Sequence, residues 1–351
     1  MLDFTNYPYF AGLGLVVTFV LFRLGIKYAP KWGLLDTPDA HKGGRKNHTG
    51  NIPLIGGLII IPVYTALIYS SALQTQTFLA PLIGGVLLLL FIGALDDRSH
   101  IHPWARFVIQ IWLACYVVVF CDANIGNLGN LYGFGDINLG DFFGKLFSAT
   151  CLVLLMNAIN LLDGMDGLCG GFLMIALGWL MFVALTAGAI LPFWAMLFLT
   201  VPLLGFLLFN ARYPFHKKAS VFLGDAGSLS LGLMVGWFAI QMAKAPDPMM
   251  APVGIIWIMT LPIMDTFAIF FTRRKQGRSA FSPDRLHAHY KLQDAKGWSP
   301  QVVTLILWVF SIATGAIGVL GLKAGIPEYV LLYIWSVILL GYTFYRIKID
   351  G

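Results

Sequence analysis

Long apolar segments recur along the whole chain, and they constrain the fold more than any other feature of the sequence. A helix that crosses the hydrocarbon core of a bilayer needs about 20 mostly apolar residues. Segments of this kind occupy residues 9–23, 52–70, 78–95, 105–121, 142–162, 168–187, 190–210, 220–242, 250–272, 301–321 and 328–345. Charged residues make up only 11% of the chain, against about 25% in soluble domains. The sequence therefore predicts an all-α polytopic membrane protein with about eleven transmembrane helices.

The apolar segments follow one another without a break in composition. No long polar linker separates them, so residues 1–351 are predicted to form a single integral membrane domain. The chain begins Met1-Leu2-Asp3, without the basic stretch of a secretory signal. We therefore expect the first apolar segment to be a retained helix.

The basic residues are distributed very unevenly between the connecting loops. Of the 23 lysines and arginines, all but Lys145, Lys244 and Lys323 fall in or beside the connections that follow odd-numbered segments. By the positive-inside rule, these connections lie in the cytoplasm, which places the N-terminus outside and the C-terminus inside. The net charge of +6 is then explained by topology, and no nucleic-acid partner is expected.

Two adjacent carboxylates, Asp96 and Asp97, stand at the predicted cytoplasmic end of the third segment. The C-terminus of a helix already carries partial negative charge, so this pair is electrostatically unfavourable there. A bound divalent cation would resolve the repulsion. The alternative is that both groups are solvated at the membrane surface and paired with Arg98.

A second polar cluster ends the fifth segment. Asn157, Asn160, Asp163 and Asp166 recur at every third position, so that neighbours in the series share one face of a helical turn. A capping or turn function would explain one aspartate, but not four polar residues in register at the end of an apolar helix. We therefore interpret this series as part of a functional site.

Two further aspartates lie within apolar segments. Asp225 is near the predicted cytoplasmic end of the eighth segment, where it could cap a helix or bind a metal shared with the other clusters. Asp265 lies eight residues before Arg273, which places it about 12 Å inside the ninth segment. It could reach the same site, but we favour a structural role for it.

The longest cytoplasmic loop, residues 273–299, contains a helix-start pattern at Ser282. A helix from that point would place Arg285 and His289 on one face, and His287 and Lys291 on the next. Such groups bind anions well. A zinc site is poorly supported because a single His-x-His has no companion ligands, and an ordinary solvated loop is the simplest alternative.

Carboxylates, amides and cationic groups gathered at one membrane face suit metal-assisted phosphoryl transfer. Mg²⁺ prefers oxygen ligands and is often held jointly by carboxylates and substrate phosphates. Since the site would lie where bilayer meets cytosol, the acceptor is expected to be a lipid. The residues alone indicate no particular sugar.

Taken together, the clusters resemble those of the polyprenyl-phosphate N-acetylhexosamine-1-phosphate transferases, the glycosyltransferase family 4 that includes the WecA, TagO and MraY types. The matching motifs are PLIGG at 53–57, LDDR at 95–98, NAINLLDGMDGL at 157–168, VFLGDAGS at 221–228 and SPDRLHAH at 282–289. They occur in the family's order, and the eleven-helix prediction agrees with the resemblance.

The resemblance implies a function for each cluster. Asp225 would be the principal ligand of Mg²⁺, for which Mn²⁺ is a substitute, with Asn160 and one or both of Asp96 and Asp97 close to the metal. Asp96 or Asp97 would deprotonate or orient the lipid phosphate, and Asp163 would act with them in catalysis. The nucleotide-sugar pocket would be formed by Asp36, His48, Asn157, Asn160, Asp163, Asp166, Arg285, His287 and His289.

The implied reaction transfers GlcNAc-1-phosphate from UDP-GlcNAc to undecaprenyl phosphate, with UMP as product, as the first membrane step of a cell-surface glycan pathway. It would take place at the cytoplasmic face of a bacterial inner membrane. Loop residues 282–289 are closest to the WecA type, but the His-x-His-His pattern usual there ends in Tyr290. Another UDP-N-acetylhexosamine donor therefore remains an alternative, a membrane transporter is a less favoured one, and a homodimer is left open.

Overall fold

The computed structural model describes residues 4–37, 50–75, 78–99, 101–244, 248–279 and 285–350. The protein is mostly helical. Its main helices are α1 (Tyr7–Trp32), α2 (Gly56–Ser70), α3 (Leu79–Ser99), α4 (Pro103–Phe120), α5 (Gly140–Leu162), α6 (Leu168–Thr186), α7 (Ile190–Asn210), α8 (Gly224–Ala243), α9 (Pro252–Ile258), α10 (Thr260–Lys275), α11 (Ala288–Lys296), α12 (Pro300–Lys323) and α13 (Glu328–Asp350). Short 3-10 turns at Phe4–Asn6 and Leu73–Thr75 complete the helical elements.

Each predicted apolar segment coincides with a helix or a pair of helices. Within the described ranges, nine helices are long and apolar enough to cross a membrane. Of the other two segments, α2 is shorter because Ile52–Pro53 forms strand β2, which pairs antiparallel with β1 (Leu35–Asp36). The segment at 250–272 is broken into α9 and α10, which meet at an angle of 76°. Pro262 explains the break, because it cannot donate to the carbonyl of Ile258 and its ring crowds that group.

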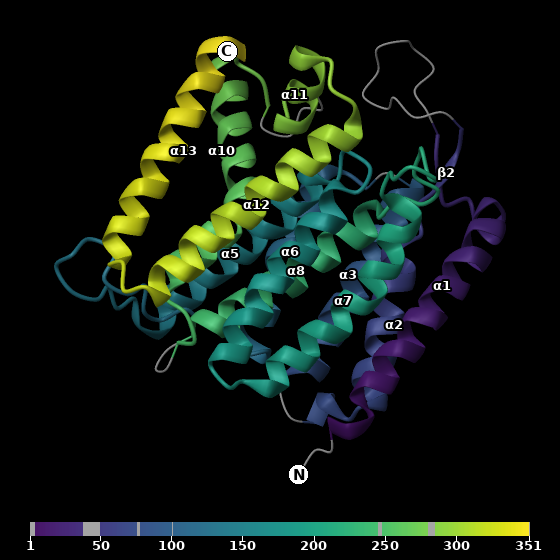
Figure 1. Cartoon of the computed structure of the whole chain (residues 1–351), viewed down its shortest axis with the longest axis horizontal. Coiled ribbons are helices and arrows are strands. Elements are labelled where there is room, and N and C mark those ends of the chain that lie inside the picture. Colours follow the sequence, from purple (N-terminus) through teal and green to yellow (C-terminus); the bar gives the residue numbers. More distant parts are fainter. Residues whose placement is uncertain are drawn as a thin grey trace.

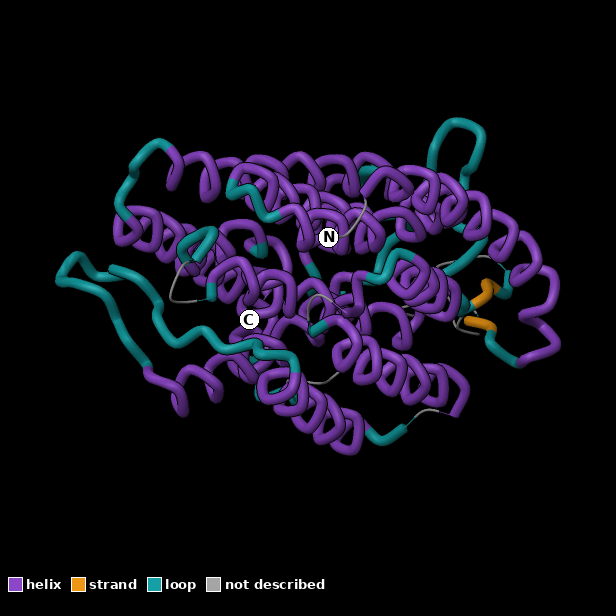
Figure 2. The backbone as a smooth tube through the Cα atoms, turned by 90° about the horizontal axis from the view of Figure 1, so that it is seen from below, coloured by secondary structure: helices purple, strands orange, loops and turns teal. Residues whose placement is uncertain are grey.

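The long helices form one body, with α1 at one flank and α13 at the other, while α12 runs obliquely across the middle of the view (Figure 1). The start of α1 and the end of α13 lie at opposite ends of the molecule in the same view. The β1–β2 pair occupies one edge, next to the helical body (Figure 2). The prediction of a multi-pass helical membrane protein is thus confirmed.

The outward side chains of the peripheral helices are apolar. On α13, Val337, Leu340 and Phe344 are all at least 66% exposed. On α1 and α4, Leu13 and Val108 are exposed to a similar degree. A protein in water rarely exposes apolar patches of this extent. These surfaces are therefore suited to contact with lipid.

Helix α8 forms the centre of the bundle. Only Asp225 and Gln241 among its residues are not fully buried. A helix that is apolar on all sides must be enclosed by others, and α2, α3, α5 and α6 surround it. Because the rest of the helix is buried, Asp225 in the first turn is the accessible residue at the start of α8.

Small residues allow α8 to approach its neighbours closely. A Cβ atom at Gly93 of α3 would overlap the backbone of Ala226, and a Cβ at Gly57 of α2 would overlap that of Gly227. Such contacts between small residues are typical of helices that associate in membranes. They bring the end of α3 and the start of α2 against the first turn of α8.

The segment before α8 is also fixed to the start of α2. The backbone N–H of Phe222 donates to the carbonyl of Pro53 at 2.8 Å, and the N–H of Gly56 donates to the carbonyl of Phe222 at 2.9 Å. These bonds set α2 and α8 to begin at the same level. The first turn of α8 is therefore held from two directions.

The close approach at Gly93 predicts a stability effect. Gly93→Ala should push α3 away from α8, and overpacking of this kind costs about 1–3 kcal/mol. Gly178→Ala is the matched control, because a Cβ at this position in α6 has no atom within 4 Å. We expect the midpoint of thermal unfolding in detergent to fall for Gly93→Ala only. Equal midpoints for the two variants would contradict this packing.

Candidate active-site cavity

A cavity of about 1040 Å³ opens at the end of the molecule where α3 and α5 end and α8 begins. Polar and charged side chains make up much of its wall. They are Asp36, Thr37, Asp96, Asp97, His102, Arg106, Asn160, Asp163, Asp166, Asn210, Arg212, Asp225, Arg285, Tyr290 and Gln293. The cavity thus collects residues from every sequence cluster that was predicted to form a site.

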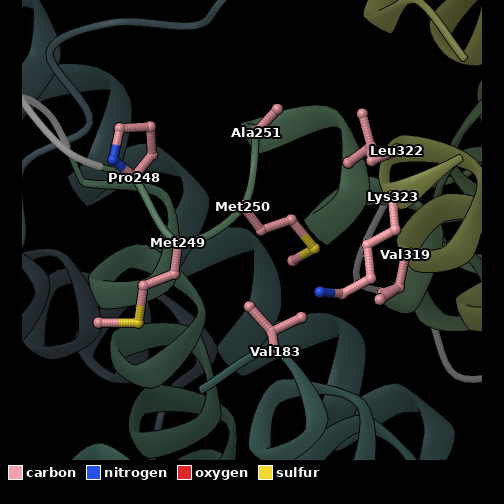
Figure 3. Close-up of a pocket in the computed structure, with 8 residues that line it drawn as sticks. All are labelled: Val183, Pro248, Met249, Met250, Ala251, Val319, Leu322 and Lys323. Atoms are coloured by element: carbon pink, nitrogen blue, oxygen red, sulfur yellow. The ribbon is translucent and has the colours of Figure 1, made fainter. Parts of the chain in front are cut away.

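A smaller hollow of about 250 Å³ lies at the far ends of α6 and α12 (Figure 3). Its wall is formed mainly by apolar side chains such as Met249, Met250 and Leu322, and Lys323 is the charged group among them. No carboxylate is among the described residues that line it. The large cavity is therefore the better candidate for chemistry on phosphates.

Arg106 joins two of the predicted metal-site aspartates. Its Nη1 lies 2.7 Å from Oδ2 of Asp96 and 2.5 Å from Oδ2 of Asp225. The other oxygen of Asp96 accepts from the N–H of Ile101 at 2.7 Å. Sequence reasoning treated Arg106 only as a topology signal, because its distance along the chain from Asp225 concealed the contact. A cation at the start of an apolar helix was the available clue.

Asp97 is held by the first turn of α8. Its Oδ1 and Oδ2 accept from the backbone N–H groups of Asp225 and Ala226, at 2.9 and 3.3 Å. Gly224 makes this possible because its φ of +74° suits glycine, and a Cβ there would lie 2.5 Å from Oδ2 of Asp97. The partial positive charge of a helix N-terminus stabilises a carboxylate at this position.

The two asparagines of the fifth segment have different surroundings. Asn160 Nδ2 donates to Oδ1 of Asp225 at 2.7 Å and to Oγ of Ser228 at 2.8 Å. Asn157 does not line the cavity, and its Nδ2 donates to Oε1 of Gln110 at 2.6 Å. The predicted series is therefore divided: Asn160 belongs to the carboxylate cluster, and Asn157 connects α5 to α4.

The turn between α5 and α6 carries the two other acids of the series. Asp166 accepts from Nε of Arg212 at 2.6 Å and from the N–H of Ala219 at 3.1 Å. Buried Asn210 bridges the same region, since it accepts from Gly167 N–H and donates to the carbonyl of Val221. These contacts tie the turn to the segment that leads into α8.

Asp163 lines the cavity immediately after the end of α5. Burial, and after it the negative charges of Asp225, Asp97 and Asp166, raise the pKa of its carboxyl to about 8. Burial and the neighbouring acids thus both disfavour a negative charge on Asp163.

The loop helix begins later than predicted. α11 starts at Ala288, whereas Arg285 and Leu286 are not helical, so the prediction that Arg285 and His289 share a helix face is wrong. Residues 282–284, which carried the helix-start pattern, lie outside the described residues. The reason is a cap from another element: Asp265 accepts from the N–H of Ala288 and contacts Nδ1 of His287, both at 2.8 Å. The structural role favoured for Asp265 is thus the one its contacts indicate.

The three predicted donor-site residues of this loop are placed differently. Arg285 lines the cavity, whereas His287 and His289 are buried behind it, with ring centroids 5.5 Å apart. Among the pocket's other predicted residues, Asp36 lines the cavity from β1. His48 lies outside the described residues.

The residues fit a magnesium ion that shares its ligands with a substrate. Among the described residues, no three acidic, histidine or cysteine side chains converge to enclose a metal. Mg²⁺ commonly uses only one or two carboxylates and completes its shell with water and phosphate oxygens. Asp225 offers such oxygens, Asn160 is hydrogen-bonded to it through Nδ2, and the surrounding acids outnumber the guanidinium of Arg106. Added positive charge would therefore be favourable here.

Comparison with known proteins identifies the family to which the chain belongs. Residues 79–243 match the model of glycosyl transferase family 4. The chain is 34% identical, over 91% of its length and 86% of the relative's, to the undecaprenyl-phosphate alpha-N-acetylglucosaminyl 1-phosphate transferase of Escherichia coli K12. Proteins of the same name from Salmonella typhimurium and Haemophilus influenzae are each 31% identical, covering 94% and 88% of this chain and 88% and 86% of their own lengths. The chain belongs to glycosyl transferase family 4.

Proposed function

We propose that this protein transfers GlcNAc-1-phosphate from UDP-GlcNAc to undecaprenyl phosphate and releases UMP. An oxygen of the lipid phosphate forms a new bond to the sugar-bearing phosphorus, and the bond from that phosphorus to the UMP oxygen breaks. The number of phosphoanhydride bonds is conserved, so no water or further reactant is consumed. The observation that carries the proposal is the cluster of Asp96, Asp97, Asn160 and Asp225 in one large cavity of a family member.

Magnesium is the cofactor that we propose, with manganese as a substitute. Asp225 would hold it together with Asn160, whose amide now donates to Asp225 and would turn to present its oxygen. Asp96 or Asp97 would lie nearby. The bound ion would neutralise negative charge that develops on the phosphates. Arg106 would then move its contact from Asp225 to Asp96 alone or to a substrate phosphate. Magnesium dependence is supported by the charge and oxygen chemistry of this wall.

Asp97 is better suited than Asp96 to orient the lipid phosphate or accept its proton. Asp96 is buried and forms an ion pair with Arg106 at 2.7 Å, so it is poorly accessible to a lipid phosphate, whereas Asp97 is only half-buried. The contacts of Asp97 are to backbone N–H groups of α8. This difference supports a catalytic function for Asp97 and a positioning function for Asp96.

The donor would occupy the opposite wall of the cavity. Arg285 offers a planar group that matches phosphate geometry, and Asp163, Asp166 and Asp36 lie along the same cavity. The ion pair of Asp166 with Arg212 supports a role for Asp166 in holding Arg212 in place. Arg285 and Arg212 are therefore the cationic groups that we assign to the donor side.

We further propose that the cavity faces the cytoplasm of a bacterial inner membrane. The cations near the cavity, including Arg106, Arg212 and Arg285, support this orientation under the positive-inside rule. A transporter would be expected to place its polar site near the membrane midplane between related halves. The acids lie instead at one end of the bundle, and the relatives' names give a transporter no support. A single domain and a homodimer remain predictions.

Metal removal and donor choice can be tested together. Purified protein with undecaprenyl phosphate should release UMP from UDP-GlcNAc in Mg²⁺, lose this activity in EDTA, and regain it when Mg²⁺ or Mn²⁺ is added in excess. A panel of UDP-N-acetylhexosamines tests the alternative donors. Full activity in EDTA would exclude the proposed cofactor, and release from another donor only would replace UDP-GlcNAc.

Asp225 is the residue on which the proposed metal site depends most. Asp225→Asn keeps the size of the side chain but removes its charge, so UMP release should fall at least about 100-fold while expression is unchanged. Asp141→Asn is the matched control, because Asp141 is 72% exposed at the other end of α5. Near-normal turnover by Asp225→Asn would refute the role in metal binding.

The raised pKa of Asp163 predicts a pH effect on stability when magnesium is absent. An unfolded aspartate loses its proton at about pH 4, whereas the folded protein retains this proton up to about pH 8. The folded state therefore binds more protons in this interval, and the free energy of unfolding falls as the pH rises through it. Asp163→Asn should reduce the fall, measured as thermal midpoints at about pH 5 and about pH 8. An undiminished fall would show that Asp163 is not responsible.

A further inference from the structure

Tyr290 connects two parts of the cavity that are far apart in the sequence. Its hydroxyl donates to the carbonyl of Gly164 at 3.0 Å, which joins α11 to the turn that carries Asp163. The contact is close, because a Cβ at Gly164 would lie 2.5 Å from Nε2 of His289 and 3.1 Å from the Tyr290 hydroxyl. Tyr290 itself is only 8% exposed.

The ring of Tyr290 also supports the guanidinium of Arg285. The guanidinium carbon of Arg285 lies 4.4 Å from the ring centroid, within the range of a cation–π interaction. Asp294 holds the same guanidinium from a second direction, at 2.8 Å from Nη2 and 3.3 Å from Nε. Arg285 precedes the helix, so these two contacts fix the position of its charged group at the cavity wall.

We propose that Tyr290 is a positioning residue that sets the affinity for the UDP-sugar donor, by anchoring α11 to Gly164 and holding Arg285 against its ring. The inference rests on the proposed function, since it assumes that Arg285 meets the diphosphate of the donor. A histidine at this position has no hydroxyl beyond its ring to reach the Gly164 carbonyl. Tyr290 therefore departs from the His-x-His-His pattern and makes a hydrogen bond that a histidine, which has no hydroxyl, could not supply.

Two variants separate the contacts of Tyr290. Tyr290→Phe removes the bond to Gly164 and keeps the ring under Arg285, so the KM for UDP-GlcNAc should rise about five-fold. Tyr290→Leu also removes the ring and should raise that KM by a further two- to five-fold, roughly. The KM for undecaprenyl phosphate should stay unchanged in both. A general loss of structure would raise the KM values for both substrates. A rise in the KM for UDP-GlcNAc alone therefore identifies a positioning role.

Tyr116→Phe is the matched control. Tyr116 also donates its hydroxyl to a backbone carbonyl, that of Pro81 at 3.2 Å, but it joins α4 to α3 outside the cavity. We expect its KM values to equal those of the wild type. Calorimetry with UDP-GlcNAc and the magnesium-loaded protein should reproduce the loss of affinity for Tyr290→Phe without relying on turnover.

The outcomes distinguish this inference from the proposed function. An unchanged affinity for UDP-GlcNAc in Tyr290→Phe would overturn the inference, as would an equal rise in the KM of both substrates. If the wild type binds UDP-GlcNAc but releases no UMP, the proposed reaction fails, whereas the calorimetric comparison still decides the role of Tyr290.

Discussion

Several carboxylates are gathered at the end of an apolar bundle and repel one another. The rest of the structure has to compensate for this repulsion. Asp96, Asp97, Asp163 and Asp225 line one cavity, and Arg106 contacts two of them directly. Charges at the edge of a low-dielectric region interact strongly. Such an arrangement is stable only with compensating positive charge or bound protons. This repulsion adds to burial in raising the pKa of Asp163, and it is the physical basis of the divalent cation that we propose.

The helical bundle has to hold these groups together against their repulsion. It does so through α8, which is enclosed on all sides and approached closely by α2 and α3 at Gly57 and Gly93. The backbone N–H groups at its first turn bind Asp97, and its Asp225 accepts from Asn160 of α5. Packing in the apolar interior and the chemistry of the cavity are therefore linked through one helix.

Much of this arrangement could be predicted from the sequence. The lengths of the apolar segments locate the helices, and the acids at segment ends locate the site, because both signals are local. The bend between α9 and α10 and the late start of α11 were not predicted. They depend on Pro262 within an otherwise apolar run and on a cap that Asp265 supplies from another helix. Arg106 and Tyr290 were likewise not recognised as site residues, since their partners Asp225 and Gly164 are more than a hundred positions away.

The central claim is that Asp225 and Asn160 provide a metal site that the substrate completes. Binding of Mn²⁺ to the purified protein, followed by electron paramagnetic resonance with and without UDP-GlcNAc, tests it most directly. The account predicts that UDP-GlcNAc strengthens Mn²⁺ binding to the wild type and that Asp225→Asn abolishes this bound signal. Equal Mn²⁺ binding by the wild type and Asp225→Asn would contradict it.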